Sequence, residues 1–344
     1  MTAERPDLTS PKPPALARNP GIHLDPEWIE EVRVDEGEVA AALAAARANS
    51  LPEERETPEV PPPSGGKART VQPTAGIRDR AAWLLRAVAC IDLTTLSGDD
   101  TPSRVRRLCA EARTPVASSL LRAVGAGDRL LTTAAVCVYH EMAEIALEAL
   151  EGSRIPVAAV SAGFPHGLSA LSARLTEIEA SVAIGVQEID AVFPRFLVLE
   201  GDWSRLYEEV RAYRQACGGA HLKMILSTGE LGSLANVEKA SLVCMMAGAD
   251  FIKTSTGKEK VNATLPAGFV MARAIREYAR RTGYEVGLKP AGGIRTTEEA
   301  LEWLTLARNE LGERWTGPSL FRFGASSLLD DLRRELERLA KERT

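Results

Sequence analysis

Short apolar runs alternate with longer amphipathic stretches from about Arg78 to the end of the chain. Each run is too short for a globular helix, whereas stretches such as "WSRLYEEVRAYRQACG" have the apolar spacing of a helix that packs on one face. The runs therefore predict strands, and the stretches between them predict helices. The eight predicted strands lie within residues 88–95, 133–139, 155–164, 188–193, 221–228, 249–255, 285–292 and 320–326.

This alternation favours a closed (β/α)8 barrel. Strands separated by helices pair in parallel through right-handed crossovers, and eight such units fit a barrel better than an open sheet. A doubly wound open sheet is the alternative, although no GxGxxG motif follows any of the runs. Barrels of this kind place catalytic groups at the C-terminal ends of their strands. The first site candidates therefore close the apolar runs: Asp92, Thr94, Cys137, Asp190, Lys253, Lys289, Gly324 and Ser326.

The first 75 residues differ in composition from the rest. They contain 12 of the 20 prolines, in stretches that sustain little regular structure. We predict an N-terminal extension over residues 1–75, largely irregular, with one alanine-rich helix over residues 35–48. The barrel domain is predicted over residues 76–344.

Composition and charge narrow the class of protein further. The 344-residue chain is 45% hydrophobic and 26% charged, and its net charge of −5 provides no basic surface for nucleic acid. The five cysteines form no CxxC pair, which indicates reduced thiols in the cytoplasm. No segment has the ~20 apolar residues of a membrane span, and the N-terminus does not resemble a signal peptide. We expect a soluble cytoplasmic protein without nucleic-acid or membrane partners. Barrels of this kind are often dimers, so a homodimer or higher homo-oligomer is the expected assembly.

Two of the predicted strands end on a lysine. Lys253 and Lys289 are 36 residues apart, about one βα unit, so a barrel would place them on adjacent strands at the same rim. A single lysine at such a position is usually explained by an ion pair with a carboxylate. Two together repel each other by roughly 4 kcal/mol at ~4 Å and an effective dielectric of ~20, which could lower the pKa of one lysine to between about 7 and 8.

A lysine with so low a pKa is partly neutral near pH 7 and can attack a carbonyl to form a Schiff base. Lys253 follows Phe251 and Ile252, so its side chain is the more desolvated of the pair. We therefore predict that Lys253 is the nucleophile and that Lys289 perturbs its pKa.

Carboxylates close two further runs. Asp190 lies at the strand position that matches the two lysines, where it could move protons as a Schiff base and an enamine interconvert. A helix cap or an ion pair is an equally open interpretation of Asp190. Glu188 points to the same side one layer deeper, and Asp92 would orient Lys289 or the substrate.

Glycine-rich loops after the seventh and eighth runs predict an anion site. Backbone N–H groups in such loops approach a phosphate closely, and a following helix N-terminus favours negative charge. Tight turns and helix caps alone would also explain either loop. The four histidines form no HxH or HExxH cluster, which disfavours a metal-dependent reaction. The predicted binding residues are Asp92, Thr94, Cys137, Thr256, Gly257, Lys258, Gly292, Gly293, Ile294, Arg295, Gly324, Ala325, Ser326 and Ser327.

These segments resemble motifs of the deoxyribose-phosphate aldolases over about residues 78–335. The motifs are "FIKTSTGKEKVNAT", "LKPAGGIRT", "EIDAVF", "IDLTTLSGDDT", "AAVCVY", "GFPHG" and "FRFGASSLL". "NPGIHLD" and "AAWLLRAV" are similar to the longer branch of that family, which also occurs in animals. One departure is the ending "RLAKERT", which lacks the tyrosine that members often have near the C-terminus.

The resemblance implies a class I aldolase that needs no cofactor. Such an enzyme cleaves 2-deoxy-D-ribose 5-phosphate reversibly to acetaldehyde and D-glyceraldehyde 3-phosphate. By similarity, Lys253 corresponds to the Schiff-base lysine, Lys289 to its activating neighbour and Asp190 to the proton-relay aspartate. Two alternatives remain: another Schiff-base sugar-phosphate aldolase or transaldolase-like barrel, and a non-catalytic barrel that binds sugar phosphate.

Overall fold

The computed structural model describes residues 18–48, 74–127 and 130–343. These residues contain eight strands, and each lies inside one of the eight predicted runs. Nearly all strand residues are buried, which explains why apolar residues dominate the runs, as in β2 and β3. The strands are β1 Ile91–Thr94, β2 Ala135–Tyr139, β3 Val157–Ser161, β4 Glu188–Val192, β5 His221–Ile225, β6 Phe251–Lys253, β7 Gly287–Lys289 and β8 Phe323–Ala325.

The strands form one parallel sheet that closes on itself. Its order is β7-β6-β5-β4-β3-β2-β1-β8, so neighbours in the chain are neighbours in the sheet. Parallel bridges from Leu288 to Phe321 and from Ala291 to Gly324 join the two ends. The predicted (β/α)8 barrel is therefore confirmed, and the doubly wound open sheet is excluded.

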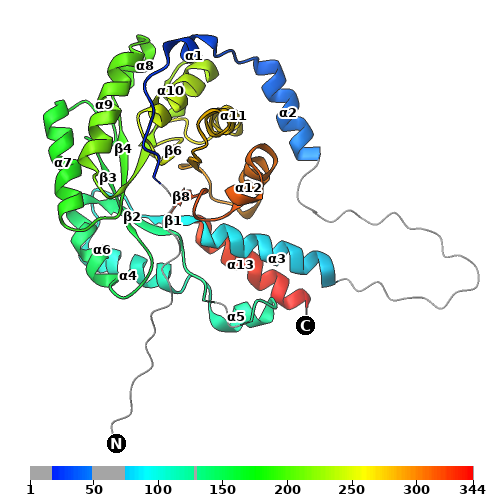
Figure 1. Cartoon of the computed structure of the whole chain (residues 1–344). Helices are drawn as coiled ribbons and strands as arrows, with labels where there is room; N and C mark the ends of the chain where they lie inside the picture. The colour runs from blue at the N-terminus through cyan, green and yellow to red at the C-terminus, as the bar shows by residue number, and fades with distance from the viewer. Residues whose placement is uncertain (1–17, 49–73, 128–129, 344) are drawn as a thin grey trace, which may run out of the picture.

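Helices surround the barrel and return the chain from the end of one strand to the start of the next (Figure 1). The first of them, α3, lies beside the last, α13, so the helix layer closes as the sheet does. The helices of this layer are α3 Thr74–Ala89, α4 Pro102–Arg113, α5 Ser118–Ala123, α6 Ala143–Ala149, α7 Leu171–Ala183, α8 Phe196–Leu199, α9 Trp203–Ala216, α10 Leu234–Met246, α11 Leu265–Thr282, α12 Thr297–Leu311 and α13 Leu328–Glu342. Short 3-10 helices span His140–Met142, Thr228–Glu230 and Glu313–Thr316.

Local sequence signals explain where the helices begin and end. The Thr264 hydroxyl accepts the N–H of Ala267 at the start of α11, and Pro266 occupies the first turn, where its missing N–H costs nothing. Gly283 ends α11 with φ of 77°, a left-handed conformation that glycine adopts without strain. Thr296 and Glu299 form a reciprocal capping box at the start of α12.

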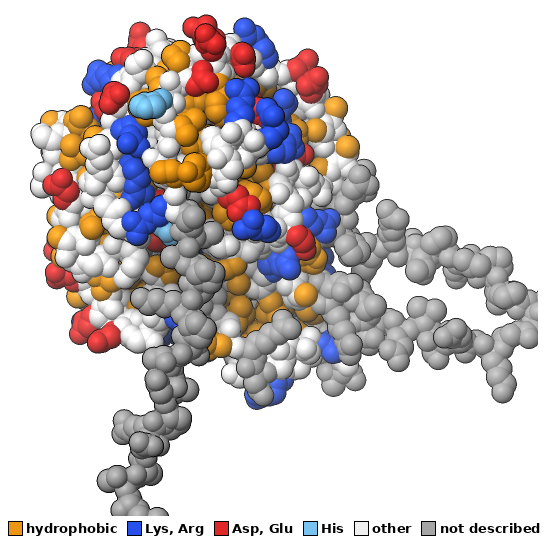
Figure 2. Space-filling view, in the orientation of Figure 1, with side chains coloured by type: hydrophobic (Ala, Val, Ile, Leu, Met, Phe, Trp, Pro, Cys, Tyr) orange, Lys and Arg blue, Asp and Glu red, His pale blue; other side chains and the backbone are white. Residues whose placement is uncertain are grey.

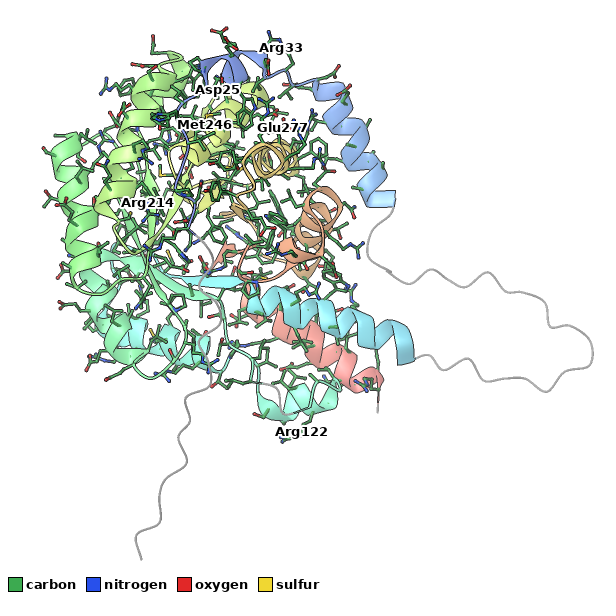
Figure 3. The ribbon with its side chains drawn as sticks, viewed as in Figure 1. Asp25, Arg33, Arg122, Arg214, Met246 and Glu277 are labelled. Atoms are coloured by element: carbon green, nitrogen blue, oxygen red, sulfur yellow. The ribbon has the colours of Figure 1, made fainter. Side chains whose placement is uncertain are left out.

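Residues 18–48 pack on the outside of the helix layer. They include α1 (Pro26–Glu31) and α2 (Glu36–Ala48), the latter within the helix predicted over 35–48. Figure 3 shows Asp25 and Arg33 of this segment at the outer side of the helices that contain Met246 and Glu277. Residues 1–17 and 49–73 of the predicted extension lie outside the described residues.

Asn19 attaches this segment to the barrel. Its side-chain amide donates to the carbonyl oxygens of Met245 and Ala249 at 2.7 and 3.0 Å, and its oxygen accepts the Tyr278 hydroxyl at 3.0 Å. Its backbone N–H donates to Asp250 at 3.0 Å. Asn19 is buried, so these bonds replace contacts that water would otherwise make.

Positive and negative side chains are interspersed on the face shown in Figure 2. Among the described residues, no helix is both long and apolar enough to cross a membrane.

Candidate active site

The two predicted lysines lie side by side. Lys253 at the end of β6 pairs in register with Lys289 at the end of β7. Lys253 Nζ and Lys289 Nζ each donate to Asp190 Oδ2 at 2.7 Å. One carboxylate oxygen therefore bridges the two amines, and all three predicted residues meet at the C-terminal end of the barrel.

Asp92 and Asp190 hold Lys289 from two sides. Lys289 Nζ lies 2.5 Å from Asp92 Oδ2 as well as 2.7 Å from Asp190 Oδ2. Burial acts to lower the pKa of Lys289, but the two carboxylates outweigh it and raise this pKa above its ordinary value. Lys289 is therefore a permanent cation in this site.

Lys223, Arg322 and Glu188 belong to the same buried cluster but were not predicted as site residues. For Glu188, we predicted only that it lies one layer deeper than Asp190. Lys223 on β5 lies 2.6 Å from Glu188 and 3.0 Å from both Asp92 and Asp190. Arg322, next to β8, pairs with Asp92 at 2.7 Å and with Glu188 at 3.0 Å. A lysine inside "HLKMI" and an arginine inside "LFRF" were the available signals, because a charged residue within a buried strand needs a partner.

Lys253 is the unmatched charge of the cluster. Within the described residues, the cluster contains three carboxylates, and three other basic side chains make seven close ion pairs with them. Lys253 pairs only with Asp190, whose oxygen it shares with Lys289. The cluster is therefore electrically balanced when Lys253 is neutral. The members are Asp92, Glu188, Asp190, Lys223, Lys253, Lys289 and Arg322.

The pKa of Lys253 lies below its ordinary value, and burial is the largest cause. Asp190 opposes this shift, and the Lys289 ammonium adds to it. We predicted from the sequence that repulsion between the lysines is the main cause, and this order of importance was wrong. Desolvation dominates because Lys253 is only 2% exposed at the mouth of a packed barrel.

Asp190 remains ionised in this setting. Burial raises its pKa, but Lys223, Lys253 and Lys289 together hold the pKa well below its usual range. The Cys137 thiol lies 4.0 Å from Asp190, and burial raises its pKa, so it stays protonated. Asp190 is therefore an ionised carboxylate that can accept a proton, and the cations around it favour release of that proton.

A cavity of about 320 Å³ opens above Lys253. Lys253 lines it, whereas the Asp92, Cys137, Asp190 and Lys289 side chains lie in the barrel beneath. The other predicted binding residues line it as well: Thr94, Thr256, Gly257, Lys258, Gly292, Gly293, Ile294, Arg295, Gly324, Ala325, Ser326 and Ser327. Thr95, Leu96, Ser97 and Ala291 also line the cavity and were missed, although Thr95 ends the first apolar run and Leu96 and Ser97 follow it directly.

The glycine loops give this cavity a backbone lining. Gly292 has φ of 81°, and a Cβ there would lie 2.7 Å from the Asn262 side chain, so no larger residue fits without a shift. Ser327 precedes α13, whose N-terminus therefore faces the cavity with its positive dipole end. Small residues and a helix N-terminus on one wall form a surface suited to an anion.

No group of three or more His, Cys, Asp or Glu residues in the described ranges is arranged to hold a metal ion.

Comparisons with known proteins agree with this geometry. The model of the DeoC/LacD family aldolases matches residues 86–334. The chain is 52% identical to the deoxyribose-phosphate aldolase of Mus musculus over 320 residues, which cover 92% of this chain and 93% of that protein. It is 49% identical to the deoxyribose-phosphate aldolase of Homo sapiens over 322 residues, which cover 93% and 94%.

Solved structures share the fold at lower identity. A structure from Coccidioides immitis has a TM-score of 0.60 at 23% identity and covers 88% of this chain and 99% of its own. A tetrameric deoxyribose phosphate aldolase from Aeropyrum pernix has a TM-score of 0.56 at 21% identity, with 75% and 96% covered. These similarities support the barrel architecture.

Proposed function

The chain belongs to the DeoC/LacD family of aldolases, and we propose that it reversibly cleaves 2-deoxy-D-ribose 5-phosphate to acetaldehyde and D-glyceraldehyde 3-phosphate. The reaction runs through a Schiff base on Lys253. One observation supports this choice of nucleophile most directly. Of the three lysines in the buried cluster, Lys253 alone lines the cavity, and it alone has a lowered pKa.

In the first step, neutral Lys253 Nζ attacks C1 of the open-chain sugar. The carbinolamine loses water, and the resulting iminium withdraws electrons from the carbon chain. Acetaldehyde contains two carbons, so the bond that breaks is C2–C3. Its electron pair forms an enamine on C1 and C2, while the C3 hydroxyl loses its proton and becomes the aldehyde of glyceraldehyde 3-phosphate.

Asp190 acts as the general base and then the general acid of this step. As a buried carboxylate it accepts the C3 hydroxyl proton, directly or through a water molecule, and the same proton is returned to C2 of the enamine. Lys289, 2.7 Å from the same oxygen, keeps Asp190 ionised before it accepts the proton and favours the return of that proton to C2. Hydrolysis of the new iminium then releases acetaldehyde and regenerates Lys253. The iminium itself is the electron sink, so the proposed reaction requires no cofactor.

The phosphate of the substrate binds at the glycine and serine loops. Gly292, Gly293 and Ser326 line the wall next to α13, and Lys258 and Arg295 supply positive charge at the rim. Asp92 and Cys137 are not among the residues that line the cavity, so we do not propose that they bind the substrate. Asp92 pairs with Lys289, and we assign it the role of orienting that lysine.

Reductive trapping tests this proposal. Wild-type protein treated with substrate and borohydride should gain the mass of a reduced adduct on Lys253, and product analysis should find acetaldehyde and glyceraldehyde 3-phosphate. Lys253→Arg should form no adduct, whereas Lys260→Arg, an exposed lysine outside the cavity, should react as the wild type does. An adduct with other products would indicate a different Schiff-base aldolase, and no adduct at all would indicate a non-catalytic sugar-phosphate barrel.

We also propose a cytoplasmic location and a homo-oligomeric state. The five cysteines are all free and buried, as expected of a reduced protein. Light scattering on the purified protein tests the oligomeric state.

A further inference from the structure

The carboxylate of Glu259 is directed at the backbone of its own loop, between β6 and α11. The Thr256 N–H lies 3.0 and 3.1 Å from its two oxygens, and the Thr256 hydroxyl donates to Oε2 at 2.7 Å. The Lys258 N–H donates to the same oxygen at 3.2 Å. Burial raises the pKa of Glu259, but the bonds from Thr256 outweigh it, so the pKa lies below its ordinary value.

Glu259 also joins this loop to two neighbouring loops. Arg195, which follows β4, lies 3.5 Å from Glu259 and 2.6 Å from Glu230, which follows β5. The Ser227 hydroxyl provides a further hydrogen bond to Glu259. The Glu259 side chain is only 2% exposed, so three barrel loops meet around one buried charge.

The position of Gly257 connects this arrangement to the cavity. Gly257 lies between the two residues whose N–H groups donate to Glu259, and it lines the cavity together with Thr256 and Lys258. Its φ of 83° turns the chain at this point. Fixing the peptide groups on both sides therefore fixes the surface that residues 256–258 present to the substrate.

We propose that Glu259 is a positioning residue that holds residues 256–258 in the shape that binds the substrate phosphate. This inference rests on the proposed aldolase function. Glu259 is not among the residues that line the cavity, so its role would be exerted through residues 256–258. Its negative charge alone would repel a phosphate, and Arg195 compensates for that charge.

The test compares recognition of phosphate with chemistry on Lys253. The first measurement is the KM for 2-deoxyribose 5-phosphate. The second is the rate at which acetaldehyde, which has no phosphate, and cyanoborohydride modify Lys253. Glu259→Ala removes every acceptor and should raise the KM by about 30-fold, the scale of losing hydrogen bonds to a charged group. The acetaldehyde reaction should stay within about twofold, because the strands that hold Lys253 are unchanged.

Two further variants separate positioning from simple charge effects. Glu259→Gln keeps one acceptor oxygen, so it should rescue most of the loss and raise the KM only about threefold. Glu230→Gln removes the other carboxylate that pairs with Arg195 but touches no part of residues 256–258, so the KM should not change. If the charge of Glu259 acted only by repelling phosphate, Glu259→Gln would lower the KM instead.

The following outcomes would overturn the inference. The first is an unchanged or lower KM in Glu259→Ala. The second is a rise in KM in Glu230→Gln as large as that in Glu259→Ala. The third is a loss in the acetaldehyde reaction of Glu259→Ala as large as its loss with the phosphorylated sugar. Failure of the proposed function looks different, because the wild type itself would then neither cleave the phosphorylated sugar nor form the acetaldehyde adduct.

Discussion

Replacing Lys289 by methionine tests whether a neighbouring cation sets the reactivity of Lys253. Methionine keeps the length of the side chain and removes its charge. The buried cluster then contains three carboxylates and only two permanent cations, Lys223 and Arg322, so a protonated Lys253 restores the balance. The pKa of Lys253 should therefore rise.

The distances give the size of this rise. Lys253 Nζ and Lys289 Nζ each lie 2.7 Å from Asp190 Oδ2, so the two nitrogens are at most about 5.4 Å apart. At that separation and an effective dielectric of ~20, two unit charges repel by roughly 3 kcal/mol, or about 2 pH units. At pH 7 the neutral fraction of Lys253 in Lys289→Met should fall up to ~100-fold, because each pH unit below the pKa costs about tenfold.

The assay is the rate of Lys253 modification by acetaldehyde and cyanoborohydride between about pH 5.5 and 10. The midpoint of the pH profile reports the pKa separately from the overall rate, which Lys289 could also affect through proton transfer. Lys258→Met removes a lysine at the rim, bonded to the Leu96 carbonyl and outside the cluster, so its midpoint should stay in place. A midpoint unchanged in Lys289→Met would refute the electrostatic role of Lys289 and leave burial as the whole cause.

Three other predictions concern the carboxylates of the cluster and the attachment of the N-terminal segment. Asp190→Asn removes the anion that raises the pKa of Lys253, so the midpoint of acetaldehyde modification should move to lower pH, while turnover falls at least ~100-fold for want of a proton acceptor. The pKa values of Glu188 and Asp190 in the folded protein lie below their ordinary values. The stability that these two carboxylates give to the fold is therefore complete above about pH 5 and is lost as the pH falls. The urea midpoint should drop from pH 5 to pH 3, and it should drop less steeply in Glu188→Gln. Asn19→Ala should lower the free energy of unfolding by about 2–4 kcal/mol, because it leaves buried polar groups unpaired, and should leave kcat/KM unchanged; urea denaturation and steady-state kinetics measure both.

The fold could be predicted from the sequence because its signals are local. Almost every strand residue is buried, and helices such as α11 have a capping threonine, an early proline and a terminal glycine within a single segment. A run of short apolar segments separated by such helices has few solutions other than a barrel. The packing of residues 18–48 could not be predicted in this way, because Asn19 bonds to residues more than 220 positions away.

The candidate site was predictable in part, because some of its signals are also local in the sequence. Lys253, Lys289 and Asp190 each end or nearly end an apolar run, and the barrel rule places such residues at one rim. Lys223 and Arg322 lie on strands β5 and beside β8, and their partners come from β1 and β4. A charged residue inside an apolar run indicates that it has a partner, but the local sequence does not say which residue that partner is, so the sequence does not show which lysine is neutral.

The structure separates chemistry from substrate recognition. Lys253, Lys289 and Asp190 are fixed by strand register inside a packed barrel, where a small displacement would break several ion pairs at once. The proposed phosphate site lies on loops, where Glu259 accepts hydrogen bonds from the residues after β6 and makes none of the ion pairs of the cluster beneath. Loop geometry can therefore change while the pKa of Lys253 stays constant. Substitutions around Glu259 should alter the preference for phosphorylated over unphosphorylated aldehydes at constant midpoint, whereas substitutions in the cluster should move the midpoint for both kinds of substrate alike.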